Sequence, residues 1–174
     1  MKLTWFGGTT LRVHIGGSIL VIDAAGAPAG ISQVELTGAA DRLLALDGSA
    51  EPADPVTWRP RAPARLLDEA SAPPAIECRT IGSRAIVIDS SIEPPLVILG
   101  AELPRLGRWA DRAVVVLLGT NGAGRAMDLL DAHAPKLLAL ALDEPDLDRA
   151  FAELPPRLDG TGLVALERGL AVEV

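Results

Sequence analysis

The glycine-rich segment Gly119–Gly124 (GTNGAG) has the residue types and spacing best suited to ligand chemistry in this chain. It follows an apolar run and precedes a predicted helix, so its backbone N–H groups could hold an anion. The candidate anion-binding residues are Gly119, Thr120, Asn121 and Gly122. The spacing is neither GxGxxG nor GxxxxGK[ST], and no lysine follows. We therefore favour the alternative, a turn in which Thr120 or Asn121 caps the helix.

Other groups that could do chemistry are sparse and scattered. The two histidines, His14 and His133, lie in different predicted elements, and neither has a second histidine at ligand spacing. His14 falls on the polar phase of an alternating strand, and His133 ends a predicted helix. The single cysteine, Cys78, is expected to be a small buried hydrophobe within a strand. The sequence therefore predicts no metal or other cofactor and no nucleophile of the GxSxG type.

The composition favours one domain with an aliphatic core. Of the 174 residues, 49% are hydrophobic and 3% aromatic, which is enough apolar material for a buried core. The formal net charge of −7 disfavours nucleic acid and membrane surfaces as partners. No secretory signal pattern or membrane-span length of apolar residues is recognised. We expect a bacterial-type cytoplasmic protein, and the aliphatic surplus favours a homo-oligomer such as a homodimer.

The first half of the chain is predicted to be rich in strands. Alternating apolar residues between glycine pairs predict an antiparallel meander. The expected elements are strands at 2–6, 11–15, 18–22 and 33–36 and a short helix at 39–46. Six prolines disfavour long elements between residues 49 and 74. In that region we expect a strand fragment at 56–58, helical turns at 64–69, and a solvated loop holding Arg59, Arg61 and Arg65.

The second half alternates between strands and helices. The expected strands are 75–80, 84–89, 96–99, 113–118 and 136–142, and the expected helices are 125–133 and 147–154. A terminal hairpin is expected to pair residues 162–166 with 170–174. This order predicts an α+β protein, an αββα sandwich of two mixed sheets packed face to face with helices outside.

The chain opens MKLTWFGGTTLRVHIGGSILVIDAAG and continues with QVELTGAADRLLAL. This layout resembles the metallo-β-lactamase superfamily, in particular its small cytoplasmic branch of metal-dependent hydrolases related to ascorbate-phosphate lactonase. In that family a strand–WLGH–strand–IDP stretch leads to THxHxDH, which supplies metal ligands on a loop after a strand. The resemblance implies a truncated, degenerate metallo-β-lactamase-like domain over residues 1–174, and it is strongest at 1–42 and 96–142.

The resemblance further implies a scaffold without its metal site. The expected ligand positions hold Gly8, Gly38, Ala40 and Arg42, and Ala101 replaces a bridging aspartate after the strand that ends in ILG. Glycine and alanine side chains have no donor atom, and arginine is a permanent cation. The resemblance therefore predicts a fold and argues against the family's metal-dependent activity.

Two carboxylates at matched positions remain as weak catalytic candidates. Asp23 stands at the position of the IDP aspartate, where we expect it to satisfy backbone N–H groups. Asp41 remains a candidate general base or lone metal ligand. Because one carboxylate alone holds Zn²⁺ poorly, we expect Asp41 instead to pair with Arg42 or to cap a helix.

Our leading hypothesis is a non-catalytic homologue of the metallo-β-lactamase fold, a pseudoenzyme without a metal centre that acts by binding or assembly. The alternative is a hydrolase of a small phosphorylated or lactone substrate that uses a relocated site in the old cleft. Its candidate residues are Asp23, Asp41, Glu102, Thr120 and Asn121. That alternative rests on analogy between folds, which is a weak basis for function. A third reading is a structural subunit of a homodimer or complex.

Overall fold

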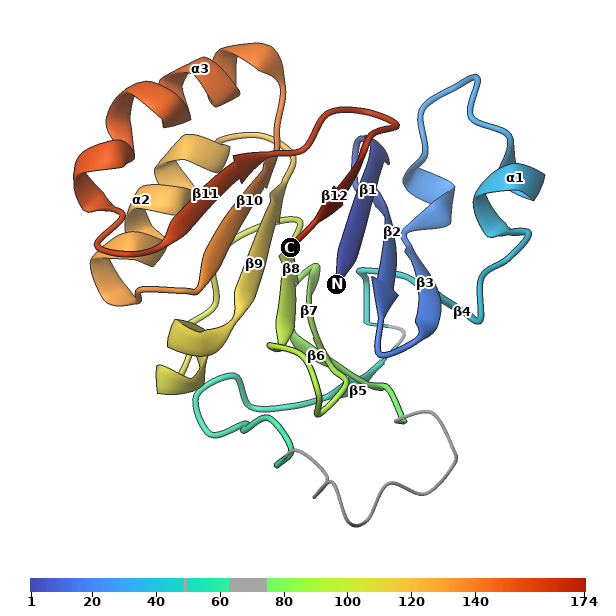
Figure 1. Cartoon of the computed structure of the whole chain (residues 1–174), viewed down its shortest axis with the longest axis horizontal. Helices are drawn as coiled ribbons and strands as arrows, with labels where there is room; N and C mark the ends of the chain where they lie inside the picture. Colours follow the sequence, from blue (N-terminus) through green and yellow to red (C-terminus); the bar gives the residue numbers. More distant parts are fainter. Residues whose placement is uncertain (49, 63–74) are drawn as a thin grey trace.

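The structure is a computed structural model that describes residues 1–48, 50–62 and 75–174. Within these residues two β-sheets pack face to face, and two longer helices lie against the outer side of one of them (Figure 1). The protein is therefore α+β, with two mixed sheets in a sandwich, as predicted. The helical turns expected at 64–69 lie outside the described residues.

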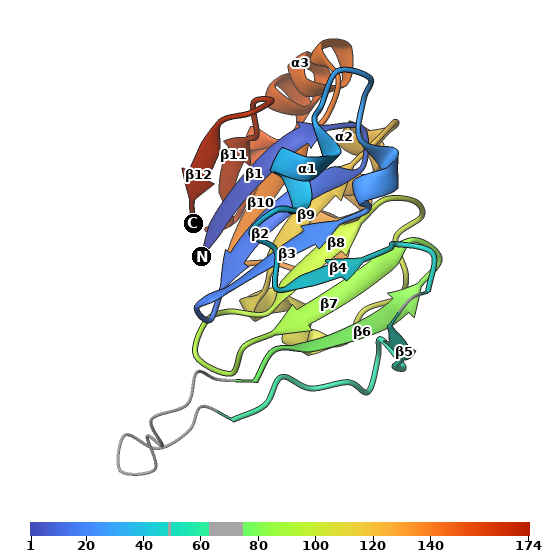
Figure 2. The same cartoon turned by 90° about the vertical axis from the view of Figure 1, so that its right-hand side faces the viewer.

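The first sheet is built mainly by the predicted N-terminal meander. β1 (Lys2–Gly7), β2 (Thr10–Ile15) and β3 (Ser18–Ile22) pair antiparallel in chain order. β4 (Arg42–Leu44) adds parallel to β3, and β12 (Ala171–Glu173) adds antiparallel to β1. The strand order is thus β12-β1-β2-β3-β4, and Figure 2 looks onto this sheet.

The second sheet has the order β11-β10-β9-β8-β7-β6-β5. Its strands are β5 (Glu51–Pro52), β6 (Glu77–Gly82), β7 (Ala85–Asp89), β8 (Leu96–Leu99), β9 (Val114–Leu118), β10 (Leu137–Ala141) and β11 (Gly162–Ala165). Strands β6, β7 and β8 are antiparallel neighbours, whereas β8, β9, β10 and β11 run parallel. The carboxyl ends of four strands therefore meet at one edge of this sheet.

Helices cover the two sheets unequally. α2 (Gly122–Ala132) joins β9 to β10, and α3 (Glu144–Glu153) joins β10 to β11, and both lie on the outer side of the seven-stranded sheet (Figure 1). The five-stranded sheet has the short helix α1 (Gln33–Thr37) and the 3₁₀ helix η1 (Ala24–Gly26) beside it, and Arg12 of β2 donates to carbonyl oxygens of α1. Among the described residues no helix has the length and apolar character to span a membrane.

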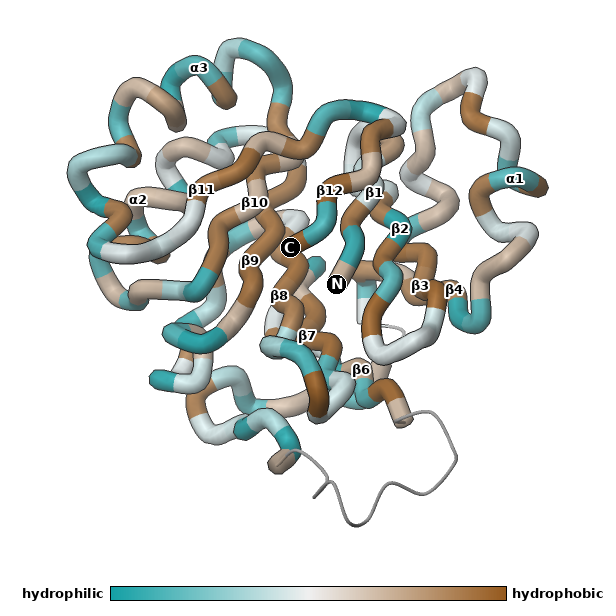
Figure 3. The backbone as a smooth tube through the Cα atoms, viewed as in Figure 1, coloured by the Kyte–Doolittle hydropathy of each residue, from teal (hydrophilic) through white to brown (hydrophobic). Residues whose placement is uncertain are grey.

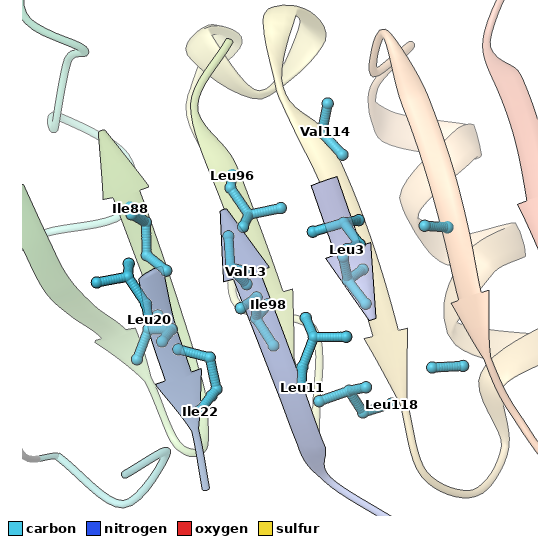
Figure 4. Close-up of a cluster of buried hydrophobic side chains, with 14 of the residues drawn as sticks. Leu3, Leu11, Val13, Leu20, Ile22, Ile88, Leu96, Ile98, Val114 and Leu118 are labelled. Atoms are coloured by element: carbon cyan, nitrogen blue, oxygen red, sulfur yellow. The ribbon is translucent and has the colours of Figure 1, made fainter. Parts of the chain in front are cut away.

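The central strands are buried on both faces because they pack between two layers. Leu96 and Ile98 of β8 belong to the core between the sheets (Figure 4), whereas Val97 and Leu99 belong to the core beneath the helices. The same alternation holds in β7 and β9. A strand with two buried faces needs apolar residues at every position. This explains the continuous hydrophobic colour of these strands in Figure 3.

Several expected elements are wrong, each for a local reason. Residues 33–36 form α1 instead of a strand, because Ser32 caps the helix by accepting the N–H of Glu35 at 3.3 Å. Residues 39–46 contain β4 instead of a helix, with Leu43 exposed and Leu44 buried as in a half-buried strand. The strand fragment expected at 56–58 is also wrong, since residues 55–57 form a turn and Trp58 belongs to no strand.

The expected terminal hairpin is also wrong. β11 pairs parallel with β10 in the seven-stranded sheet, and β12 pairs antiparallel with β1 in the five-stranded sheet. The segment between them crosses from one sheet to the other, where the N–H of Gly169 donates to the carbonyl of Trp5 at 2.7 Å. The C-terminal strands therefore link the two sheets instead of pairing with each other.

The core between the sheets is expected to dominate stability. Leu11 is fully buried there, so Leu11→Ala should lower the free energy of unfolding by about 2–5 kcal/mol through lost contacts and a cavity. Leu43→Ala is the matched control, because Leu43 is 58% exposed and its truncation should change stability by less than about 0.5 kcal/mol. Urea unfolding measures both, and equal losses would contradict this packing.

Candidate functional site

A cavity of about 640 Å³ lies at the carboxyl ends of the parallel strands β8 and β9. One wall is the segment after β8, with Ala101 and Glu102, and the other is the loop after β9, with Thr120 and Asn121. In open α/β sheets ligands bind at the carboxyl ends of parallel strands. The structure therefore brings part of the predicted glycine-rich loop and Ala101 to one candidate site.

The side chain of Arg125, from the first turns of α2, fills the inner end of this cavity. The residue is 8% exposed. Its Nη1 donates to the carbonyl oxygens of Leu99 at 3.2 Å and Ala101 at 2.6 Å. Its Nη2 donates to the carbonyl oxygens of Leu118 and Thr120. One guanidinium thus ties the end of β8 to the end of β9 and satisfies carbonyl groups that both strands leave unpaired.

The N-terminus of α2 already holds a carboxylate of the same chain. The N–H of Gly122 donates to Oδ2 of Asp146, in α3, at 3.1 Å. Asn121 is the N-cap residue in the left-handed region (φ 54°), and its side chain makes no capping hydrogen bond. Burial lowers the pKa of Arg125, and the nearby charge of Asp146 acts in the opposite direction. The anionic group at this helix N-terminus is therefore the carboxylate of Asp146 from the same chain.

Packing explains one of the glycines that suggested a ligand loop. A Cβ at Gly122 would lie 2.2 Å from Cδ2 of Leu142, which follows β10. Only glycine therefore allows α2 to start so close to the end of that strand. Gly119 has φ +81°, a conformation that L side chains rarely adopt. The glycine pattern at these two positions follows from backbone geometry and close packing.

Asp23 has the structural role expected from the sequence. Its Oδ2 accepts a hydrogen bond from the hydroxyl of Thr9 and lies 3.3 Å from Nη2 of Arg84. Its own carbonyl accepts a hydrogen bond from the hydroxyl of Thr10 at 2.8 Å. These contacts join the β1–β2 turn, the end of β3 and the β6–β7 turn. The carboxylate is engaged in holding loops together, although its partners are hydroxyl and guanidinium groups instead of the expected backbone N–H groups.

Asp41 lies at the other end of the five-stranded sheet. Its Oδ2 accepts the N–H of Ile19 at 2.7 Å, and its own N–H donates to the carbonyl of Ile19 at 2.8 Å. Arg42 donates instead to the carbonyl of Ile76 at 3.0 Å. The expected pairing of Asp41 with Arg42, and the alternative of a helix cap, are both wrong. Asp41 instead fixes the start of β4 to the start of β3.

The five positions matched to lost metal ligands do not come together. Gly8 in the β1–β2 turn and Ala101 after β8 lie at the end of the sandwich where β3 and β8 end. Gly38 and Ala40 precede β4, and Arg42 begins it, at the end of the sheet where β3 starts. The resemblance assigns the ligand motif to a loop after a strand, whereas this segment comes before one. Missing donors at these three positions therefore say nothing about a site near Gly8.

The histidines and the cysteine are also far from any shared site. His14 lies on the outer face of the five-stranded sheet, since Val13 and Ile15 on either side enter the core between the sheets. His133 follows α2 on the other outer side, with Nδ1 3.1 Å from a carboxylate oxygen of Asp111. Burial raises the pKa of the Cys78 thiol, as expected for an unreactive core residue.

No family model, curated protein or solved structure matches this chain. The function of this chain is therefore inferred from its own residues and their geometry. Within the described ranges, no group of three or more His, Cys, Asp or Glu side chains is arranged to hold a metal ion.

Sequence reasoning does not single out two arginines that the structure shows to be central. The signal for Arg125 is its position on the apolar stripe of α2, four residues before the fully buried Leu129. Arg61 was expected in a solvated loop, which is wrong, because its Nε lies 2.8 Å from Oδ2 of the buried Asp89. Arg65 lies outside the described residues.

Arg125→Met is expected to destabilise the fold by about 3 kcal/mol or more, because buried carbonyl groups at the ends of β8 and β9 lose their donors. Arg125→Lys should restore little, since an ammonium cannot span both strand ends as the planar guanidinium does. Arg149→Met is the matched control on the exposed side of α3 and should cost less than about 0.5 kcal/mol. Equal losses in denaturant unfolding of the first and last variants would contradict the role of Arg125.

His14 is expected to make stability depend on pH. Desolvation and then the charges of Lys2 and Arg12 lower its pKa below the ordinary value of 6.5. As pH falls below 6.5, the unfolded chain binds the proton before the folded chain does, so the free energy of unfolding falls. His14→Gln should reduce the stability difference between pH about 7.5 and pH about 5. Urea unfolding at both pH values measures this, and an unchanged difference would contradict it.

Proposed function

We propose that this protein is a non-catalytic binding protein, in which the chain's own charged groups bind the backbone where an active site usually lies. The observation that carries the proposal is the guanidinium of Arg125, buried where β8 and β9 end and bonded to four backbone carbonyls. A second internal contact, from Asp146 to the N–H of Gly122, uses the helix N-terminus beside it.

The chemistry of the cavity supports this proposal. A catalytic site needs a nucleophile, a base or an electrophile within reach of one substrate position. The side chains that line this cavity include the carboxylates Glu102 and Asp128 and no imidazole or thiol. The Nη1 and Nη2 groups of Arg125 donate to backbone carbonyls of the chain itself. The cavity thus offers carboxylates that could act as bases, and among the residues that line it there is no imidazole or thiol to act with them.

Membership of the metallo-β-lactamase superfamily, as a degenerate branch, is part of the proposal. The antiparallel meander, Asp23 directly after its third strand, and the sandwich of two mixed sheets support it. The position of Gly38, Ala40 and Arg42 counts against the motif matching in the sequence. The two histidines of the chain lie on opposite outer sides of the sandwich, so they cannot bind one metal ion together, whichever residues are matched to the family's motif.

The alternative of a relocated hydrolase has weaker support. Three of its candidates, Glu102, Thr120 and Asn121, line the cavity after β8 and β9. The other two, Asp23 and Asp41, lie at opposite ends of the five-stranded sheet, and each is already held by hydrogen bonds. They cannot act on one substrate as a general acid and base, because that requires both groups beside the same bond.

The test is metal content and turnover of the purified protein. We expect less than one equivalent of zinc, iron or manganese per chain by elemental analysis. We also expect no hydrolysis of 4-nitrophenyl phosphate or of a simple lactone, with or without added Zn²⁺ or Mn²⁺. The control is Glu102→Gln combined with Asp128→Asn, which should behave as the wild type does. Turnover that this double variant abolishes would refute the proposal and locate a catalyst in the cavity.

A further inference from the structure

Three arginines converge on a second, separate pocket at the opposite end of the seven-stranded sheet. The pocket has a volume of about 320 Å³ and is lined by Arg59, Pro60, Arg108, Trp109 and Arg112. Its arginines come from the loop at residues 53–62 and from the segment that precedes β9. No carboxylate lines it. A pocket lined by three cations is notable in a chain whose net charge is −7.

The arginines of this pocket lack anionic partners within the described part of the chain. Arg108 and Arg112 take part in none of the hydrogen bonds or ion pairs found there, and neither is shielded from solvent. Arg59 donates only to backbone carbonyls, those of Val56 at 3.0 Å and Trp58 at 2.7 Å. Asp111 lies between two of these arginines in sequence, but its carboxylate contacts His133 and the N–H of Ala134. Within residues 1–48, 50–62 and 75–174, none of these three guanidinium groups forms an ion pair with a carboxylate.

The pocket is built on a rigid base. The carbonyl of Pro55 accepts both the N–H of Gly107 at 3.0 Å and Nε1 of Trp109 at 2.8 Å. The ring of Trp58 meets that of Trp109 edge to face, with centroids 4.6 Å apart. These contacts fix the loop that carries Arg59 against the 3₁₀ helix Arg108–Arg112. Cations of like sign held close together repel each other, and a bound anion removes that repulsion.

We propose that this pocket, the three-arginine pocket, binds a small anion with two or more negative charges, of the phosphate-ester class. Guanidinium groups match phosphate oxygens through paired N–H donors, and three of them suit a group with several charged oxygens. The volume lies at the lower end of the range of small-molecule sites. An adjoining pocket of about 660 Å³ shares Pro60 and Arg112. Its lining combines apolar residues such as Ile92 and Pro94 with further charged side chains, the cations Arg61 and Lys136 and the carboxylates Asp89, Glu93, Asp111 and Asp159. A larger ligand whose charged group lies in the three-arginine pocket would contact both kinds of residue there.

This inference rests on the proposed binding function and names its ligand class. It also differs from the sequence prediction, which assigned anion binding to the loop after β9. That loop is served by Asp146, whereas the three-arginine pocket has cations without carboxylates. The two locations lie at opposite ends of the parallel strands, so variants of one leave the other intact.

The probe is inorganic pyrophosphate, titrated into the full chain at low ionic strength. Trp58 and Trp109 lie at the pocket, so binding should change tryptophan fluorescence, and calorimetry should give the affinity. Arg108→Gln combined with Arg112→Gln should weaken binding at least about tenfold, because both are charged partners of the anion. The matched control is Arg105→Gln combined with Arg149→Gln, exposed arginines that do not line the pocket. It should keep the wild-type affinity, and added salt should weaken binding.

Three outcomes would overturn the inference. The first is no calorimetric binding of pyrophosphate at millimolar concentration. The second is equal loss in both double variants, which would show a diffuse surface effect. The third is acetate binding as tightly as pyrophosphate at equal ionic strength. Circular dichroism of each variant confirms folding. A phosphate-release assay on the same samples separates the two proposals, since turnover would refute the non-catalytic function, whereas absent binding refutes only the ligand site.

Discussion

The guanidinium of Arg125 lies where the carboxyl ends of β8 and β9 meet, and its hydrogen bonds reach backbone carbonyls of both strands. Parallel strands end with carbonyl groups that need donors, and in many α/β proteins a ligand or a helix N-terminus satisfies that edge. Here a side chain from the following helix does so. The guanidinium therefore lies at strand ends where ligands commonly bind in open α/β sheets, beside a cavity of about 640 Å³.

The contacts of Arg125 belong to a larger set of close contacts at the start of α2. The start of α2 also lies close to the residue that follows β10, since a Cβ at position 122 would meet the side chain of Leu142. The carboxylate of Asp146 then reaches the free N–H at the helix start and lies near the guanidinium. The charges of Arg125 and Asp146 therefore interact with each other and with the backbone instead of with a bound ligand. Three arginines that form no ion pair within the described residues lie at the other end of the strands, around Trp109.

Much of the fold follows from the sequence, because its strongest patterns come from burial. The meander is predictable from glycine pairs between alternating strands, and β9 from valines that enter two cores in turn. The short elements fail because few residues define them. Ser32 and Glu35 formed a capping signal for α1 that competed with an apparently apolar run. Nothing local reveals that β11 and β12 belong to different sheets, since that depends on partners distant in sequence.

The candidate site is less predictable than the fold. The sequence locates the loop after β9 and its helix correctly, but the partner of Gly122 lies 24 residues away in α3. Matching Gly38, Ala40 and Arg42 to a ligand motif fails in geometry, because similarity of short aliphatic segments does not fix which end of a strand a loop follows. A cation on the apolar stripe of a helix, as at position 125, was the informative signal, because a buried arginine must find acceptors.

The most direct test of this account is a crystal structure of the protein grown in the presence of Zn²⁺ or Mn²⁺. We predict density for the Arg125 guanidinium between the ends of β8 and β9, within hydrogen-bond distance of carbonyls from both, and no metal ion there. A metal ion or ordered ligand at that position, with Arg125 turned out toward solvent, would contradict the account.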